Sequence, residues 1–373
     1  MRVLYVTSWV MGDAGANAAD IFPRLSVQSP EIDRVIVADF PKNKYHIEAR
    51  QGAEYLRLEW NRTWLRYGLR IARKAKQADI DVIHIFYRQQ NAALAICIRL
   101  GLMLVGSKAK IIMDHRSVNL AKGARSKRKM WLNRAMQPFV HHLAGNPWAV
   151  ETNHDKITKP KHIIDLGYDQ LPEGDAREPA NVDEEVNVWF IGSLKPANRK
   201  SQFLIDVFAR VSEKQAEAVS KGARRIVMRV AGPTKDDQSR QLNANPDVVY
   251  HGKLPRLELY ELLREYPGIG LAFMNHEYHE YAPSLKFAEY AIMRYKILSS
   301  ETVGLKTQAE RMGMDGIRFV PEEVEAWADA IIEMAADYKG LEPLWEDHET
   351  WSYPDIYRRQ VLGLYKDIVD GRV

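Results

Sequence analysis

The sequence has almost no cysteine, because Cys97 is the single one among 373 residues. One cysteine cannot build an internal disulfide framework, and this scarcity fits a reducing compartment. Cys97 lies in the apolar segment ALAICIRLGL. We interpret it as a small buried hydrophobic residue rather than a reactive thiol.

The sequence also lacks a long apolar run. A membrane-spanning helix needs roughly 18–20 apolar residues, and the longest candidate, NAALAICIRLGLMLVG, is shorter and interrupted by Arg99. The opening residues MRVLYVTSWV are expected to form the first strand of the fold. They do not resemble a signal peptide, because they lack a long apolar core followed by a cleavage site. We therefore expect a cytoplasmic protein that is soluble or peripheral on the inner face of the cell membrane.

Convincing metal-binding patterns are absent as well. His276 and His279 are three residues apart in NHEYHEY, but their aromatic, loop-like setting does not favour a metal site. We therefore expect that the protein needs neither a metal ion nor another cofactor.

Acidic and basic residues nearly balance, with a formal net charge of +4, but the basic residues are clustered in 62–76 and 122–134. Four arginines of the first cluster fall close to one helical face: Arg62, Arg66, Arg70 and Arg73. The second cluster surrounds Trp131. Both clusters fit either ordinary solvated faces or surfaces that bind anionic lipid, at about 1 kcal/mol per cation near the membrane. Nucleic-acid binding is a weaker interpretation, because the aromatic residues do not form a stacking platform.

The first half of the chain alternates between short β-branched segments and helical periods. The expected strands are 2–9, 33–40, 81–87 and 110–115. The expected helices are 16–27, 62–77, 92–104 and 124–142. This alternation predicts an α/β domain, residues 1–168, with a parallel sheet covered by helices on both faces.

An acidic segment rich in proline and glycine, 169–186, predicts a linker, after which the alternation restarts. The expected strands of the second half are 187–194, 225–232, 248–254, 269–275, 296–300 and, as strand or turn, 317–321. The expected helices are 201–215, 256–266, 285–293, 324–338 and 355–369. We predict a second Rossmann-like domain, 187–350, and a closing helical segment, 351–373. Ligands bind at the carboxyl ends of such strands, and two such domains facing each other form a cleft.

The second half resembles GT-B glycosyltransferases, particularly family 4, in the order and spacing of four segments. These are VWFIGSLKPANRKSQFLIDVFARV, MRVAGP, VVYHGKLPRLELYELLREYPGIGLAFM and APSLKFAEYAIMRYKILSS. In addition, TWSYPDIYRRQVLGLY resembles the closing helix that crosses back to the N-terminal domain in that fold. The resemblance covers most of 186–370 and, more loosely, MRVLYVTSW, DVIHIF and IIMDHRSVN. It implies transfer of a sugar from a nucleoside-diphosphate sugar to a glycan or lipid-linked acceptor, as in polysaccharide or cell-envelope glycan synthesis.

Such a reaction places growing negative charge on the diphosphate, which cationic side chains and backbone N–H groups can stabilise. Gly192 ends an expected strand, and a glycine there lets the backbone approach a phosphate. The resemblance places a phosphate-binding cation at Arg199 or Lys200, while Lys195 is a further possibility.

The segment APSLKFAEY carries the other donor-site candidates. Ser284 and Leu285 begin an expected helix, whose N-terminus favours an anion. Lys286 would add a full charge beside the diphosphate, and the resemblance gives Glu289 the ribose hydroxyls. The alternative is an ordinary Lys–Glu pair on a solvated helix. The position of the upstream glutamate in the family motif corresponds to Tyr281 here. By resemblance we expect retention of configuration at the sugar.

Further candidates lie at other strand ends. The resemblance places a histidine at the position of His115, next to the sugar. Loop positions expected to line the cleft or meet the acceptor are Gly12, Asp13, Gly15, Arg88, Asp114 and Arg116. Donor contacts expected by analogy are Gly232, His251 and Gly252.

Two other functions are compatible with the same sequence. A nucleotide-sugar 2-epimerase on the same fold would need no separate sugar acceptor. A non-catalytic protein that binds a glycan or nucleic acid would keep the fold, and Lys286 and Glu289 would then be dispensable.

Overall fold

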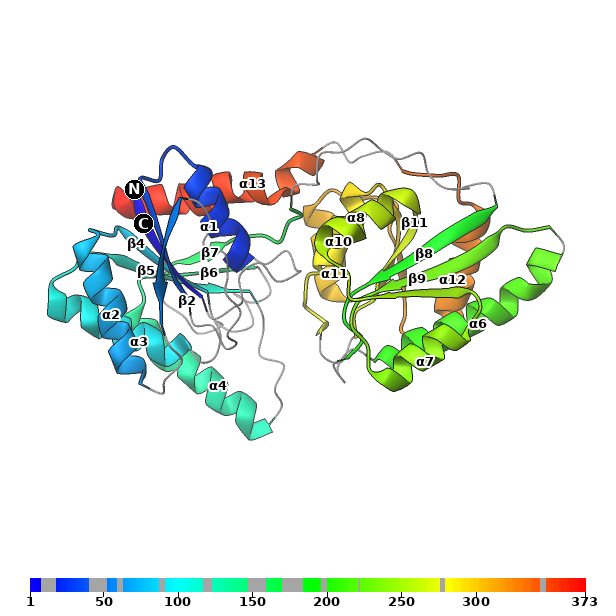
Figure 1. Ribbon diagram of the computed structural model, residues 1–373, viewed down its shortest axis with the longest axis horizontal. Helices are drawn as coiled ribbons and strands as arrows, with labels where there is room; N and C mark the ends of the chain where they lie inside the picture. Colours follow the sequence, from blue (N-terminus) through cyan, green and yellow to red (C-terminus); the bar gives the residue numbers. More distant parts are fainter. Residues whose placement is uncertain are drawn as a thin grey trace. The chain divides into compact units, whose positions relative to one another are not determined.

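The computed structural model divides the chain into two compact units (Figure 1). The N-terminal unit comprises Met1–Asp165 together with Tyr353–Val373, and the C-terminal unit comprises Leu166–Ser352. The structure describes residues 1–7, 18–39, 52–58, 63–86, 91–116, 123–146, 159–169, 184–195, 200–220, 222–275, 279–342 and 347–373. The closing segment thus belongs to the N-terminal unit, as expected. The predicted cleft between the domains stays a prediction.

The N-terminal unit is built on a seven-stranded sheet in the order β3-β2-β1-β4-β5-β6-β7. Its strands are β1 (Arg2–Thr7), β2 (Arg34–Asp39), β3 (Ala53–Arg57), β4 (Val82–Phe86), β5 (Lys110–His115), β6 (His142–Gly145) and β7 (Lys161–Ile163). Every neighbouring pair is parallel. All strands therefore end at one edge of the sheet, where ligands bind in this class of fold.

The helices of this unit cover both faces of the sheet (Figure 1). They are α1 (Ala18–Gln28), α2 (Trp64–Gln77), α3 (Asn91–Val105), α4 (Gly123–Met136), α13 (Tyr353–Ile356), a π-helical segment (Tyr357–Leu362) and α14 (Gly363–Val369). Leu4 and Ile83 point to an aliphatic core shared with α2 and α3. Alternate residues such as Tyr5 and His84 face the opposite side, where aromatic and hydrogen-bonding groups predominate.

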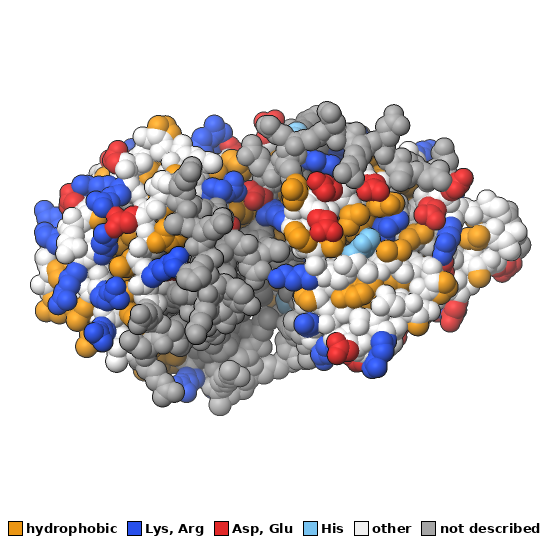
Figure 2. Space-filling model, in the orientation of Figure 1, with side chains coloured by type: hydrophobic (Ala, Val, Ile, Leu, Met, Phe, Trp, Pro, Cys, Tyr) orange, Lys and Arg blue, Asp and Glu red, His pale blue; other side chains and the backbone are white. Residues whose placement is uncertain are grey.

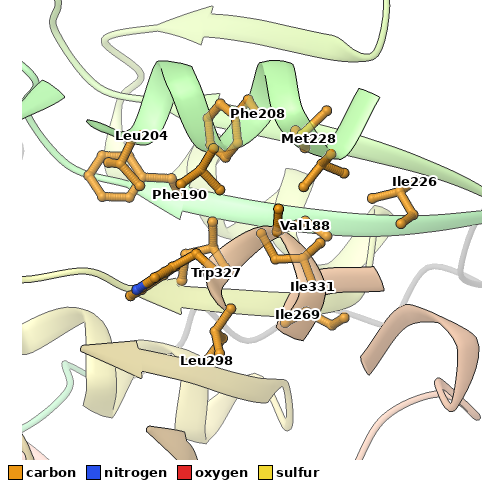
Figure 3. Packing of buried hydrophobic residues seen from close by; sticks show 14 of the residues in the cluster. Val188, Phe190, Leu204, Phe208, Ile226, Met228, Ile269, Leu298, Trp327 and Ile331 are labelled. Carbon is orange, nitrogen blue, oxygen red and sulfur yellow. The ribbon is translucent and has the colours of Figure 1, made fainter. Parts of the chain in front are cut away.

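The C-terminal unit has a six-stranded parallel sheet in the order β10-β9-β8-β11-β12-β13. Its strands are β8 (Glu185–Ile191), β9 (Arg225–Ala231), β10 (Val248–Gly252), β11 (Gly268–Ala272), β12 (Lys296–Ser300) and β13 (Arg318–Val320). Its helices are α6 (Ser201–Ser220), α7 (Asp236–Ala244), α8 (Arg256–Glu265), α10 (Leu285–Ile292), α11 (Val303–Arg311) and α12 (Val324–Ala336). Figure 3 shows side chains from β8, α6 and α12 meeting in the buried core.

The structure corrects the sequence interpretation at several boundaries. The helix expected over 124–142 ends at Met136 and continues as a 3-10 turn, because Pro138 has no N–H for the helical ladder. Strand β8 begins at Glu185, inside the segment predicted as a linker. The sequence interpretation did not predict β3, α7 or α11, and it noted the segments HHLAGN and KHIIDLGYD, which contain β6 and β7, without assigning them to strands. In the described parts of the chain, no helix has both the length and the apolarity to cross a membrane.

Candidate functional site

Three glycines end adjacent strands of the C-terminal sheet. Gly192, Gly232 and Gly252 follow or close β8, β9 and β10 with positive φ values of 141°, 147° and 69°. The Gly192 N–H donates to the Ala231 carbonyl at 2.8 Å, and the Gly232 N–H donates to the Gly252 carbonyl at 2.7 Å. A Cβ atom at Gly232 would lie only 2.1 Å from the Gly192 oxygen. Glycine is therefore required here, and the strand ends present backbone without side chains.

Helix α10 is anchored to this sheet by Tyr290. The Tyr290 hydroxyl accepts from the Ile191 N–H and donates to the Trp189 carbonyl, each at 3.0 Å. Its ring packs on Gly270, where a Cβ atom would lie 2.3 Å from the ring. These contacts position the helix at the end of β8, so that its first turn lies beside the glycine turn.

Lys286, one helical turn before Tyr290, reaches the Gly192 turn. A Cβ atom at Gly192 would lie 3.5 Å from Lys286 Nζ. The ammonium also lies 4.2 Å from the centre of the Phe190 ring and donates to the Phe273 carbonyl at 3.4 Å. A full positive charge is thus placed beside a turn at which Gly192 contributes no side chain of its own, as an anion site requires.

The start of α10 is held by a neighbouring helix. The backbone N–H of Ser284 donates to Gln308 Oε1 at 2.7 Å, and Gln308 Nε2 donates to the Ser284 carbonyl at 3.0 Å. Both side chains are buried. Gln308 of α11 therefore fixes the backbone that precedes Leu285 and Lys286, a contact that sequence analysis did not anticipate.

Glu289 lies on the same helix, and only 13% of its side chain is exposed. It is therefore not part of a solvated surface pair. Its Oε1 accepts from the Tyr260 hydroxyl at 3.3 Å and lies 3.9 Å from Arg256 Nη2. Arg256 also pairs with Asp169 at 3.2 Å. Burial raises the pKa of Glu289, although Arg256, the Tyr260 hydrogen bond and Lys286 act against that shift.

The cationic loop after β8 is partly described. Lys200 has φ of 43°, a left-handed conformation that is costly for a residue with a Cβ atom, and such strain is common at functional sites. Its ammonium pairs with Glu322. Lys195 is exposed, and its N–H donates to the Ser193 hydroxyl at 3.3 Å. A phosphate that binds Lys200 would therefore either replace Glu322 as its partner or share the ammonium group with it.

His251, the residue before Gly252, stacks on Trp189 with ring centres 5.4 Å apart and an angle of 14°. Burial and the nearby Arg229 lower the pKa of His251, so the imidazole is neutral near pH 7. The end of β10 therefore presents a neutral aromatic surface. Contact with a nucleobase there stays a prediction.

In the N-terminal unit, His115 and Asp114 end β5 and are fully buried. Asp114 Oδ2 accepts two hydrogen bonds from Arg116, at 2.9 and 2.8 Å, and lies 3.0 Å from His84 Nε2. Burial by itself would raise the pKa of Asp114, but Arg116 and His84 lower it to about 2. Asp114 is therefore held as a carboxylate at every physiological pH.

Sequence analysis missed the hydrogen-bonded chain that continues from His84. Its Nδ1 lies 2.6 Å from the Tyr365 hydroxyl, which donates to the Tyr5 hydroxyl at 3.0 Å. The Tyr5 hydroxyl is 2.6 Å from Ser26 Oγ, which is 2.5 Å from the Tyr357 hydroxyl. The chain joins β1, β4 and α1 to the closing helical segment. No local pattern could reveal it, because its members lie up to 360 positions apart.

Several predicted site residues lie outside the described residues: Gly12, Asp13, Gly15, Arg88, Arg199 and His276. Within the described ranges, no three His, Cys, Asp or Glu side chains gather in a group that could hold a metal ion. Independence from metals stays a prediction.

A comparison with protein-family models finds no match, and neither does a comparison with curated proteins. Solved structures do match, and several of them match along nearly the whole length of both chains. A glycosyltransferase from Rickettsia africae ESF-5 has a TM-score of 0.67 at 12% identity and covers 99% of this chain and 98% of its own. An α,α-trehalose-phosphate synthase (UDP-forming) from Burkholderia vietnamiensis has a TM-score of 0.64 at 14% identity, with 100% and 98% covered.

A putative UDP-N-acetylglucosamine 2-epimerase from Listeria monocytogenes is also similar, with a TM-score of 0.60, 10% identity and 98% and 96% of the two chains covered. At such low identity the likeness speaks for the fold alone. The two parallel sheets with their interleaved helices, taken with these matches, show that the chain has the GT-B fold.

Proposed function

We propose that the protein is a glycosyltransferase that moves a sugar from a nucleoside-diphosphate sugar to a glycan or lipid-linked acceptor. The observation that carries the proposal is the position of Lys286 Nζ beside the Gly192 turn, with the buried Glu289 on the same helix. The GT-B fold and the similarity to solved glycosyltransferases support it.

The geometry suits the leaving diphosphate. As the glycosidic bond breaks, charge develops on the diphosphate, and Lys286 together with the N-terminal turn of α10 would stabilise it. The bare glycine turn lets the phosphate approach the backbone closely. Side chains and helix N–H groups would thus do the work that a divalent cation performs in metal-dependent transferases, and we propose a metal-independent, retaining reaction.

Glu289 would hold the ribose. Among the described residues, its hydrogen bond and its ion pair both involve Oε1, which leaves Oε2 to accept a hydroxyl group. A charge-assisted hydrogen bond of this kind contributes about 1.5–3 kcal/mol. The ligand would also supply donors for a carboxylate whose pKa is raised by burial.

Calorimetric titration with nucleoside diphosphates, with and without EDTA, tests the donor site. We expect one base to bind preferentially, and Lys286→Met to weaken that binding at least about tenfold, since a charge-assisted contact is lost. Lys296→Met is the matched control, because Lys296 lies at the amino-terminal end of β12, whereas the candidate site lies at the carboxyl ends of the strands in the same sheet. Absence of binding to every diphosphate, or equal affinity in Lys286→Met and wild type, would refute the donor site.

A 2-epimerase is the second candidate, favoured by the similarity to the putative epimerase structure. The two activities differ in their need for an acceptor. A transferase releases the nucleoside diphosphate in proportion to the glycan or glycolipid that it makes. A sugar epimerised at carbon 2, either still attached to the nucleotide or freed from it by water, with no glycan formed, would establish the epimerase instead.

A further inference from the structure

Helices α2, α3 and α4 form one layer over the aliphatic face of the N-terminal sheet, with α3 packed between the other two (Figure 1). Helices α2 and α3 approach closely through glycines. A Cβ atom at Gly68 would lie 2.5 Å from the Cys97 backbone, and one at Gly101 would lie 2.8 Å from Ala72 Cβ. Because α2 and α3 pack this tightly, their outward side chains form a continuous surface. This surface, together with the neighbouring α4, is here named the helical face.

The helical face carries charge of one sign. Helices α2 and α4 contain five lysine or arginine residues each and α3 contains one, whereas none of the three contains aspartate or glutamate. Arg66, Arg70 and Arg73 are exposed and form no ion pair within the described parts of the chain. Figure 2 shows blue Lys and Arg side chains over the N-terminal unit, at left.

An apolar ridge runs along the middle of this basic surface. Leu100, Met103 and Leu104 of α3 are 42%, 66% and 77% exposed, and Trp131 of α4 is 65% exposed. Single exposed apolar residues are ordinary on protein surfaces, but a cluster of large ones bordered by cations indicates a binding surface. The sequence pattern had indicated only the two basic helices. The folded chain adds the ridge of α3 between them.

We propose that the helical face binds the surface of a bilayer that contains anionic lipid. The arginines of α2 would contact the phosphate groups, and the ridge of α3 would enter the boundary between headgroups and acyl chains. A nucleic acid would use the cations but leave Leu100, Met103 and Leu104 in water. A second copy of the chain, docked through the same face, would bring like charges together. The proposal does not depend on the donor site.

Vesicle flotation tests this inference on the full-length protein. We expect binding to phosphatidylcholine vesicles with about 30 mol% phosphatidylglycerol, weakening with salt, and little binding to phosphatidylcholine alone. The triple variant Arg66→Ser, Arg70→Ser, Arg73→Ser and the double variant Met103→Ser, Leu104→Ser should each reduce the partition coefficient at least about tenfold. The double variant Val219→Ser, Leu341→Ser alters exposed apolar residues of the other unit and should bind like wild type.

Insertion of the ridge can be measured separately. An environment-sensitive dye on Leu104→Cys, in a Cys97→Ser background, should shift to the blue with anionic vesicles and remain unchanged with heparin, a soluble polyanion. Three results would overturn the proposal: no vesicle binding, equal binding by the ridge variant, or concentration-dependent dimers that the ridge variant abolishes. The thermal transition of each variant verifies that it is folded.

Discussion

Two buried carboxylates, Asp114 of the N-terminal unit and Glu289 of the C-terminal unit, each lie near an arginine, yet their pKa values shift in opposite directions. Asp114 receives two hydrogen bonds from Arg116, at 2.9 and 2.8 Å, and its pKa falls to about 2. Glu289 has Arg256 at 3.9 Å and, among the described residues, one hydrogen bond, from Tyr260, and burial raises its pKa. The number and closeness of donors, rather than burial alone, decide the direction in which the pKa shifts.

The opposite pKa shifts distinguish Asp114, a structural carboxylate, from Glu289, a candidate for ligand binding. Arg116, besides holding Asp114, donates to the carbonyls of Ile164 and Asp165 at 3.2 and 3.3 Å, so its contacts stabilise the unit itself. Asp114 and Arg116, predicted to line the acceptor side, have this structural role in addition to any contact with a ligand. Glu289, in contrast, is buried at a cost that the protein only partly offsets, as is common for residues that await a ligand.

The largest expected effect follows from removing Arg116. Arg116→Met leaves the buried Asp114 carboxylate without its closest cation, which should lower the free energy of unfolding by about 3–5 kcal/mol at pH 7. Urea unfolding followed by circular dichroism measures this loss. A loss below about 1 kcal/mol would show that Asp114 does not depend on Arg116.

The pH dependence of the same variant sharpens the result. In the wild type, the folded-state pKa of Asp114, about 2, lies below its ordinary value of 3.8. Ionised Asp114 therefore contributes stability above pH 3.8 that disappears as the pH falls toward 2. Without Arg116, burial would raise the folded-state pKa, so the difference between variant and wild type should shrink in acid.

The next effect concerns Glu289 and ligand affinity. Glu289→Gln keeps the shape but loses the charge, so nucleoside diphosphates should bind about tenfold more weakly, while stability at pH 7 changes by less than about 1 kcal/mol. The pKa of Glu289 is raised above its ordinary value of 4.5. As the pH rises above 4.5, the ionised fraction of Glu289 should therefore grow, and the affinity of the wild type for nucleoside diphosphates should grow with it.

Calorimetry at several pH values, with the glutamine variant as reference, isolates this contribution from the titration of the phosphate itself. Equal affinities and equal pH profiles in the two proteins would show that Glu289 does not contact the nucleotide. Glu289 would then have only a structural role, like Asp114.

The smallest effect is expected at Tyr260, whose hydroxyl links Arg256 to Glu289. Tyr260→Phe removes one donor to Glu289, so the pKa of Glu289 should rise further and the unfolding free energy should fall by about 1 kcal/mol. Thermal unfolding and the pH profile of nucleotide binding measure the two changes. A lower pKa of Glu289 in the phenylalanine variant would contradict the contact.

The sequence predicted several residues of the candidate C-terminal site because its signals are local. The glycine at 192 and the segment from Ser284 to Glu289 each lie within one turn or helix, so neighbouring residues reveal their geometry. Arg256, Tyr260 and Gln308 escaped notice, since each reaches the site from another helix. Nothing in the sequence near position 256 indicates a carboxylate at 289.

The sequence by itself determined the alternation of strands and helices, the two Rossmann-like halves and the segment that carries Lys286 and Glu289, because these depend on periodicity and turn chemistry among neighbours. Only the tertiary structure decided the opposite pKa shifts of Asp114 and Glu289 and the exposure of the α3 ridge. Those properties depend on which distant groups meet after packing, since desolvation and hydrogen bonding act through space rather than along the chain.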